Sequence, residues 1–171
     1  NERDREMNRE QGLDHLIDVH DASFENTPCP DGAFDVVWSE DAILHSGDRR
    51  QVLREAYRVL KPGGVFIFTD PMQKEDAPAD RLQPIYDRIQ LDSLASFTLY
   101  KDIASEIGFK EAAVIDLSDQ LPLHYRRVKE ELTRRYDECV SLSGRDYVDR
   151  MLTGLQHWVD GGNSGYLSWG I

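Results

Sequence analysis

The sequence predicts an α/β fold built around a parallel sheet. Two continuous apolar runs, Phe34–Trp38 (FDVVW) and Val65–Thr69 (VFIFT), are typical of buried strands. The segment between them, Arg49–Leu60, carries an apolar stripe at helical spacing and ends at the stop signal Lys61–Gly64 (KPGG). A strand, a helix and a strand in such a short stretch form the pattern of a parallel βαβ unit, so we expect both faces of this sheet to be covered.

The segment before this unit is expected to hold a helix and a further strand. Residues 1–12 are highly charged and end in a glycine that would close a helix, while Leu16–Val19 is a short apolar run. Two prolines in Thr27–Gly32 (TPCPDG) favour a turn before the next strand. Asp48 is placed to cap the helix of the βαβ unit.

The second half of the chain is predicted to be largely helical. Residues 74–84 (KEDAPADRLQP) offer little that could be buried and indicate a surface connection, and Asp160–Gly165 (DGGNSG) indicates a turn. We therefore divide the chain into residues 1–78, which hold the βαβ unit, and residues 79–171, which add helices and the last strands of the same domain. Apolar spacing and stop signals predict helices at Ala79–Leu94, Thr98–Ile107, Leu121–Val140 and Arg145–Val159, and strands at Ala112–Ile115 and Tyr166–Ile171.

Composition excludes several classes of protein. Hydrophobic side chains make up 40% of the 171 residues, too many for a disordered chain. Lys and Arg number 20 against 32 Asp and Glu, and the net charge of -12 disfavours nucleic acid and anionic membranes as partners. Cys29 and Cys139 lack the spacing of a disulfide framework or a zinc site, so we expect a reducing compartment and no metal. No apolar run is long enough to span a membrane and the N-terminus is too charged for a signal peptide, so a cytoplasmic location is expected.

The stretch Val19–Pro71 resembles the second half of the class I S-adenosylmethionine-dependent methyltransferase core. Asp21 follows the first apolar run, and then come FDVVW, a helix ending in RVLKPGG, and VFIFTDP, in the order of that family. The motifs SEDAILHS, FTDPM and HWVDGGNSGYLSWGI are similar to N-methyltransferases that convert sarcosine and dimethylglycine into glycine betaine. The resemblance implies a Rossmann-like sheet, added helices that cover the substrate site, and S-adenosyl-L-methionine as cofactor.

One family motif is missing from the sequence. In this family a glycine-rich turn after the first strand, and an acidic residue at the end of the second, hold the amino-acid and ribose parts of the cofactor, but no GxGxG motif occurs here. The resemblance therefore implies that only strands 3 to 7 of the sheet are present and that the chain is truncated at its N-terminus. A sheet without its first two strands would leave an apolar edge, so we expect self-association or a retained N-terminal fragment.

The resemblance assigns the adenine end of the cofactor to Asp21, Ala22 and Ser23. A carboxylate there would accept a hydrogen bond from the exocyclic amine of adenine, and a following backbone N–H would meet a ring nitrogen. Ser39, at the end of a predicted strand, is a further candidate for a cofactor contact. The alternatives are that Asp21 only closes a turn, which is a common role for Asp, and that Ser39 contacts only the backbone.

Asp41 and His45 are the candidate catalytic pair, and they lie four residues apart in EDAILHS. If this stretch begins a helix, the two side chains share one face at a separation of about 6 Å. Methyl transfer needs a neutral amine, so the carboxylate would attract the ammonium form and the histidine would take its proton. Phosphoethanolamine methyltransferases place an Asp and a His at this spacing, which implies the same roles here. The alternative is a solvated Asp in a first helical turn, followed by a packed His.

Three tryptophans are candidates for the wall of a substrate pocket. The ring faces of Trp38, Trp158 and Trp169 could surround a methylated ammonium, because aromatic faces attract cations. Trp158 lies on the apolar face of a predicted helix, so a position in the core is the favoured interpretation for it.

A substrate carboxylate would need a guanidinium partner. Tyr86 with Arg88, or the run His124–Arg126, could supply it through paired hydrogen bonds. The default interpretation of both segments is a solvated helix face.

The expected function is S-adenosylmethionine-dependent N-methylation of a small amine. The expected substrates are sarcosine and dimethylglycine, and the product is the osmoprotectant glycine betaine. Two alternatives stay open. One is a phosphoethanolamine N-methyltransferase, and the other is a non-catalytic fragment that binds an amine or a partner chain. A net charge of -12, with no cluster such as Lys-x-Arg-Lys after the predicted strands, favours a zwitterionic amine over a phosphate ester.

Overall fold

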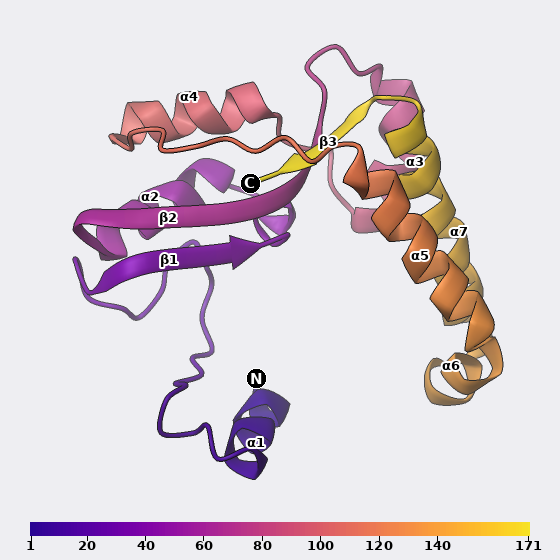
Figure 1. Cartoon of the computed structure of the whole chain (residues 1–171), viewed down its shortest axis with the longest axis horizontal. Coiled ribbons are helices and arrows are strands. Elements are labelled where there is room, and N and C mark those ends of the chain that lie inside the picture. The colour runs from indigo at the N-terminus through magenta and orange to yellow at the C-terminus, as the bar shows by residue number, and fades with distance from the viewer.

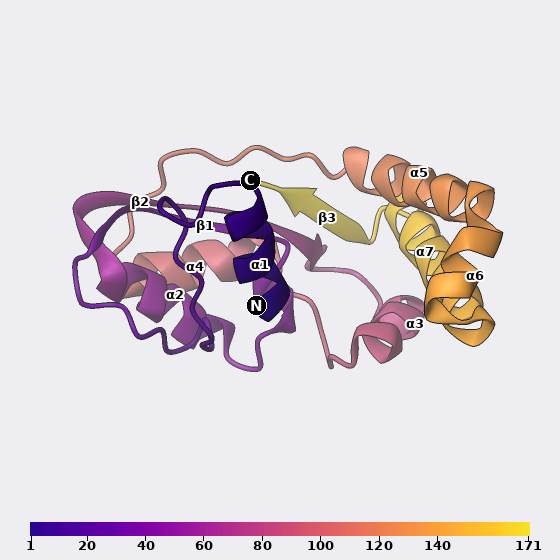
Figure 2. The ribbon, with the colours of Figure 1, turned by 90° about the horizontal axis from the view of Figure 1, so that it is seen from below.

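The computed structural model describes residues 1–171, the side chain of Ala79 excepted. The helices are α1 (Glu2–Glu10), the 3-10 turn η1 (Ile43–His45), α2 (Arg49–Val59), α3 (Ala79–Ile89), α4 (Phe97–Ile107), α5 (Gln120–Arg134), α6 (Tyr136–Ser143) and α7 (Arg145–Asn163). The strands are β1 (Phe34–Glu40), β2 (Leu60–Gln73) and β3 (Leu167–Gly170). Helices α2 and α4 lie along the sheet, whereas α3, α5, α6 and α7 group beyond the carboxyl end of β1 (Figures 1 and 2). Within the described residues, no helix has both the length and the apolar character needed to cross a bilayer.

The sheet has the strand order β1-β2-β3 and combines a parallel with an antiparallel pair. β1 and β2 run parallel, which confirms the predicted βαβ unit, and Glu40 at the end of β1 lies beside Thr69. β2 continues past this point, and its last residues, Asp70–Gln73, pair antiparallel with β3. β3 confirms the C-terminal strand that was predicted at Tyr166–Ile171, and its pairing with β2 links segments on both sides of residue 78. The division of the chain at that residue stays a prediction.

Two hydrophobic cores meet at the carboxyl end of β1. The first lies between β2, α2 and α4 and includes Leu53 and Tyr100. The second lies among α3, α5, α7 and β3 and includes Ile85. Ile43 belongs to the first core and the adjacent Leu44 to the second, so the short turn η1 is anchored on both sides.

The predicted turn at Asp160–Gly165 is wrong for its first four residues, because α7 continues to Asn163. A Cβ atom at Gly161 would lie 2.9 Å from the side chain of Leu167, and one at Gly162 would lie 2.9 Å from the side chain of Pro122. The glycine pair therefore allows close packing of a helix instead of ending it.

Three other predicted elements differ from the structure. Leu16–Val19 forms turn and coil instead of a strand, and no described strand lies beside it. Ala112–Ile115 is not a strand either, although Ile115 exchanges two backbone hydrogen bonds of 2.9 Å with Ile171. The predicted helix Leu121–Val140 is divided into α5 and α6 at Arg135.

The predicted surface connection at residues 74–84 is also corrected. α3 begins at Ala79, which confirms the start of the helix predicted at Ala79–Leu94, and it ends earlier, at Ile89. The side chain of Leu82 is 0% exposed in the core between α3 and its neighbours. Pro84 lies inside α3, so the proline did not prevent a helix there.

The expectation that both faces of the sheet are covered is wrong for this chain. Phe66 and Phe68 of β2 pack against the core under α2 and α4. On β1, by contrast, the side chains of Phe34, Val36 and Trp38 are 41%, 54% and 60% exposed. One face of the parallel pair is therefore buried, and the opposite face is open and apolar.

Candidate active site

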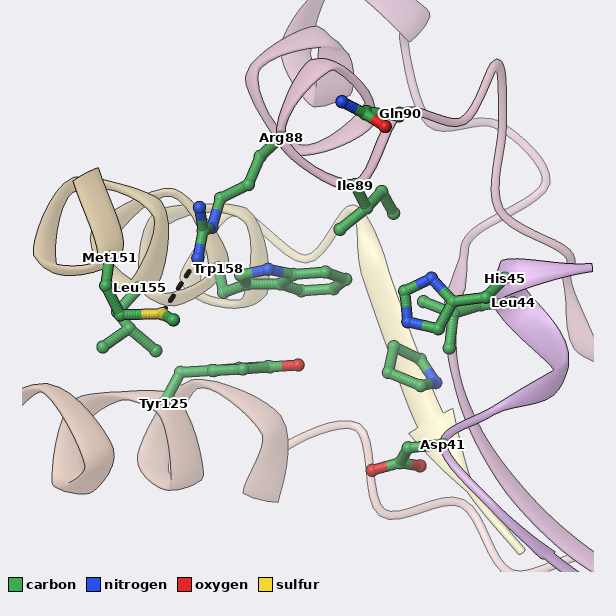
Figure 3. Close-up of a pocket in the computed structure, with 11 residues that line it drawn as sticks. Asp41, Leu44, His45, Arg88, Ile89, Gln90, Tyr125, Met151, Leu155 and Trp158 are labelled. Carbon is green, nitrogen blue, oxygen red and sulfur yellow. Dashed lines mark hydrogen bonds between the residues drawn. The ribbon is translucent and has the colours of Figure 1, made fainter. Parts of the chain in front are cut away.

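A pocket of about 390 Å³ lies where the end of β1 meets the helices of the C-terminal half (Figure 3). This position, outside the carboxyl ends of parallel strands, is where ligands bind in α/β folds. The pocket is lined by Asp41, Leu44, His45, Pro71, Arg88, Ile89, Gln90, Tyr125, Met151, Leu155 and Trp158.

Asp41 is held in the pocket wall by its backbone and by one side-chain hydrogen bond. It follows β1 with a φ of 47°, in the left-handed region that Asp tolerates better than most residues. Its N–H donates to the carbonyl oxygen of Thr69 (3.0 Å) and its Oδ1 accepts a hydrogen bond from the indole Nε1 of Trp169 (2.9 Å). Oδ2 accepts nothing from the described residues, so it is available to a ligand.

His45 comes from η1 and its side chain is exposed to the pocket. The expectation that Asp41 and His45 share one face of a helix is wrong, because Asp41 precedes a single 3-10 turn instead of beginning an α-helix. The structure nevertheless brings both side chains to the same pocket. Two cores anchor η1, so His45 projects from a fixed backbone.

Behind η1 lies Asp70, a carboxylic acid that sequence reasoning missed. It is 0% exposed, and it accepts hydrogen bonds from the backbone N–H of Leu44 (3.1 Å) and from the hydroxyl of Tyr100 (2.5 Å). Burial raises the pKa of Asp70 to about 7, the carboxylate of Asp41 acts in the same direction, and the two hydrogen bonds oppose the shift. The available signal was an acidic residue directly after the apolar run VFIFT.

Two aromatic rings form the opposite wall of the pocket. Tyr125 of α5 stacks on Trp158 of α7, with ring centroids 4.9 Å apart and planes inclined by 19°. Trp158 is 5% exposed and belongs to the second core, which confirms the core interpretation, and the same ring also lines the pocket. Burial raises the pKa of the Tyr125 hydroxyl, so the phenol stays neutral at physiological pH.

Arg88 reaches the pocket from α3. Its Nη2 donates to the thioether sulfur of Met151 (2.9 Å), and it makes no ion pair with a described side chain. In Figure 3, Arg88 and Asp41 lie at opposite ends of the pocket, with the ring of Trp158 between them. The site thus has a cationic end, an anionic end and an aromatic wall.

The residues assigned to adenine lie elsewhere. Asp21, Ala22 and Ser23 are exposed and do not line the pocket. The carboxylate of Asp21 accepts hydrogen bonds from Arg5 (2.5 Å) and from Asn1, and these bonds lower its pKa. Their assignment to the cofactor stays a prediction.

Three other candidates, Trp38, Ser39 and Tyr86, do not line the pocket either. Trp38 lies on the exposed face of β1, and Ser39 lies beside Phe68 in the sheet. Tyr86 is buried in the second core, where its hydroxyl donates to Oε1 of Gln73 (2.8 Å) and burial raises its pKa. Within the predicted run His124–Arg126, Tyr125 lines the pocket, and the residues on either side of it are exposed outside.

Residues 1–68 match a family model described as a methyltransferase domain. The chain is 55% identical over 171 residues to a sarcosine/dimethylglycine N-methyltransferase of Halorhodospira halochloris, and all of the chain aligns with 61% of that protein. It superposes with a TM-score of 0.93 on the crystal structure of a Galdieria sulphuraria protein assigned as a sarcosine dimethylglycine methyltransferase, at 41% identity, covering 99% of this chain and 62% of that one. Over its whole length the chain is similar in sequence and in fold to these methyltransferases.

More distant methyltransferases share the fold alone. A phosphoethanolamine N-methyltransferase of Haemonchus contortus, solved in complex with S-adenosyl-L-methionine, superposes with a TM-score of 0.76 at 18% identity, covering 86% of this chain and 34% of that one. The chain spans about three fifths of the length of the sarcosine/dimethylglycine relatives, 61% and 62% for the two from Halorhodospira halochloris and Aphanothece halophytica.

Proposed function

We propose that the protein methylates the nitrogen of a small zwitterionic amine, and that its substrates are sarcosine and dimethylglycine, with glycine betaine, an osmoprotectant, as the product. The observation that carries this proposal is the pairing of Asp41 with Arg88 at opposite ends of one pocket. An amino acid carries an ammonium and a carboxylate, so it complements both ends at once. The names of the relatives at 55% and 49% identity support the same substrates.

The pocket residues have separate roles in binding the amine and in removing its proton. The free oxygen of Asp41 attracts the ammonium form of the substrate, while Trp169 fixes the other oxygen. The imidazole of His45 takes the proton, so that the nitrogen lone pair is available for attack. Tyr125 and Trp158 present ring faces that attract a methylated ammonium and tolerate its added methyl groups.

S-adenosyl-L-methionine is the methyl donor in this proposal, and when bound it supplies an electrophilic methyl group on a sulfonium. The residues that the resemblance assigns to this cofactor do not form a binding pocket in this chain. Asp21 is exposed, and its carboxylate accepts hydrogen bonds from Arg5 and Asn1. The proposal therefore assigns the pocket residues to the amine, and it assigns none of them to the donor.

The test is a panel of methyl acceptors offered to the protein at the full length of its relatives. We expect turnover with sarcosine and dimethylglycine, and weak or no turnover with phosphoethanolamine. Isothermal titration with dimethylglycine and phosphoethanolamine gives an independent measure. Tighter binding of the phosphate compound would reject the zwitterion assignment, and no transfer to any amine would reject the enzyme activity.

A further inference from the structure

The side chain of Arg88 crosses α7 at Gly154. A Cβ atom at position 154 would overlap Nε and Cδ of Arg88 and would lie 2.7 Å from its Cζ. Gly154 is buried inside α7, where glycine is the residue that favours a helix least except for proline. The arginine therefore reaches the pocket through space that only a glycine leaves open.

The other two glycines of α7 have a different environment. Gly161 and Gly162 face the apolar side chains of Leu167, Ile85 and Pro122, so they serve packing between elements. Gly154 instead faces the long, flexible side chain of Arg88, which comes from the exposed side of α3. An added methyl group there would displace the arginine at little cost to the fold, because an arginine side chain can swing into solvent.

The displaced group would be the only described cation at its end of the pocket. Arg88 is the one Lys or Arg among the lining residues that the structure describes. Its described hydrogen bond is to the sulfur of Met151, a weak acceptor that uses one of five guanidinium N–H groups. The remaining donors can form a paired contact with a carboxylate.

We propose that Gly154 determines the specificity of the site for carboxylate-bearing amines, because it leaves the passage through which Arg88 enters the pocket. This inference rests on the proposed function and adds a positioning residue to it. Gly154 itself contacts no substrate, and it acts through the position of Arg88.

The experiment compares Gly154→Ala, Arg88→Ala and the double variant in the full-length protein. The substrates are dimethylglycine and N,N-dimethylglycinamide, which keeps the amine but replaces the carboxylate with a neutral group. We expect either single variant to raise the KM for dimethylglycine by about 10- to 100-fold, which corresponds to the loss of one hydrogen bond between charged groups. Because the amide has no carboxylate for Arg88 to bind, its KM should rise much less than the KM for dimethylglycine, so the ratio of the two KM values reports the change in specificity.

The double variant distinguishes an effect of Gly154→Ala on the position of Arg88 from independent damage to the pocket. If Gly154 acts through Arg88, adding Gly154→Ala to Arg88→Ala raises the KM no further, because the two changes remove the same contact. Alanine favours a helix, so the melting temperature of Gly154→Ala should equal or exceed that of the wild type. Thr153→Ala, at the neighbouring exposed position of α7, is the control and should leave the KM unchanged.

Each failure has its own signature. A wild-type protein that transfers no methyl group to dimethylglycine rejects the proposed function. A wild-type protein that is active, with Gly154→Ala leaving its KM unchanged, rejects the role of Gly154 alone. Additive effects in the double variant would also reject it, because they would mean that alanine harms the site independently of Arg88.

Discussion

At the scale of single residues, the site depends on side chains whose orientation is set by their neighbours. Asp41 adopts a positive φ at the end of a strand, a conformation that persists where the surrounding structure enforces it. Its bond to Trp169 spans 128 positions of sequence, so the last strand of the chain orients a carboxylate near the first strand. No local pattern could have predicted that contact.

Replacing His45 tests the base that the mechanism requires. His45→Ala should lower kcat by about 10²- to 10⁴-fold, the range typical of a general base, because the amine would then have to lose its proton without help. The melting temperature should change little, since the side chain is exposed. The check is the rate of methyl transfer to dimethylglycine between pH 6 and 9. A wild-type kcat across that range would exclude the base role.

Replacing Asp41 tests the attraction of the ammonium group. Asp41→Ala should mainly raise the KM for the amine, because it removes the anionic end of the pocket. Asp41→Asn is the matched variant, since its amide oxygen can still accept the hydrogen bond from Trp169 while the charge is lost. A similar rise in KM for both variants points to the charge. An asparagine variant with the wild-type KM would contradict the electrostatic role.

At the scale of elements, the parallel βαβ unit was predictable from the sequence, and the details of the site were not. FDVVW and VFIFT form β1 and the centre of β2, and α2 begins where Asp48 caps it by accepting a hydrogen bond from the N–H of Gln51. The pocket position of Arg88 and Trp158 depends on how α3, α5 and α7 pack together. That packing involves contacts between distant segments, which helical periodicity alone does not encode.

Asp70, which accepts a hydrogen bond from Leu44 in η1, makes the free energy of unfolding depend on pH. Its pKa is about 7 in the folded protein and near 3.8 when unfolded, so between these values the folded state binds more protons than the unfolded state. The free energy of unfolding therefore falls as pH rises from about 4 to about 7, by about 4 kcal/mol at most from this group. Asp70→Asn should flatten that fall, because the amide does not titrate.

The measurement is denaturant unfolding of the wild type and of Asp70→Asn at a series of pH values from 4 to 8. Asp92→Asn replaces an exposed carboxylate and serves as the control, which should follow the wild-type curve. Equal pH dependence of the wild type and Asp70→Asn would show that Asp70 does not titrate in this range.

At the scale of the whole molecule, the open face of the sheet is its largest departure from the predicted fold. Continuous apolar runs predict strands covered on both sides, and the sequence of β1 fits that expectation. Within the described residues, no strand pairs with the outer edge of β1, as the missing first strands led us to expect, but Phe34, Val36 and Trp38 on its face are also exposed to solvent. Figure 1 shows α1 standing apart from this face instead of covering it. A continuous apolar run shows that a strand is suited to burial on both faces. It does not show whether the segments that would cover those faces are present.

Because β1 has both an unpaired edge and an open apolar face, we predict that the 171-residue chain associates with a second copy of itself. An apolar edge strand with unpaired N–H and C=O groups is a template for pairing, and covering Val36 and Trp38 would remove apolar surface from water. Light scattering on the isolated chain should give a mass above that of a monomer, and Val36→Lys should shift it toward the monomer. Leu142→Lys changes an apolar residue that is 78% exposed on α6, away from the sheet, and should leave the mass unchanged. A wild-type chain that stays monomeric at high concentration would mean that the net charge of -12 outweighs the apolar edge.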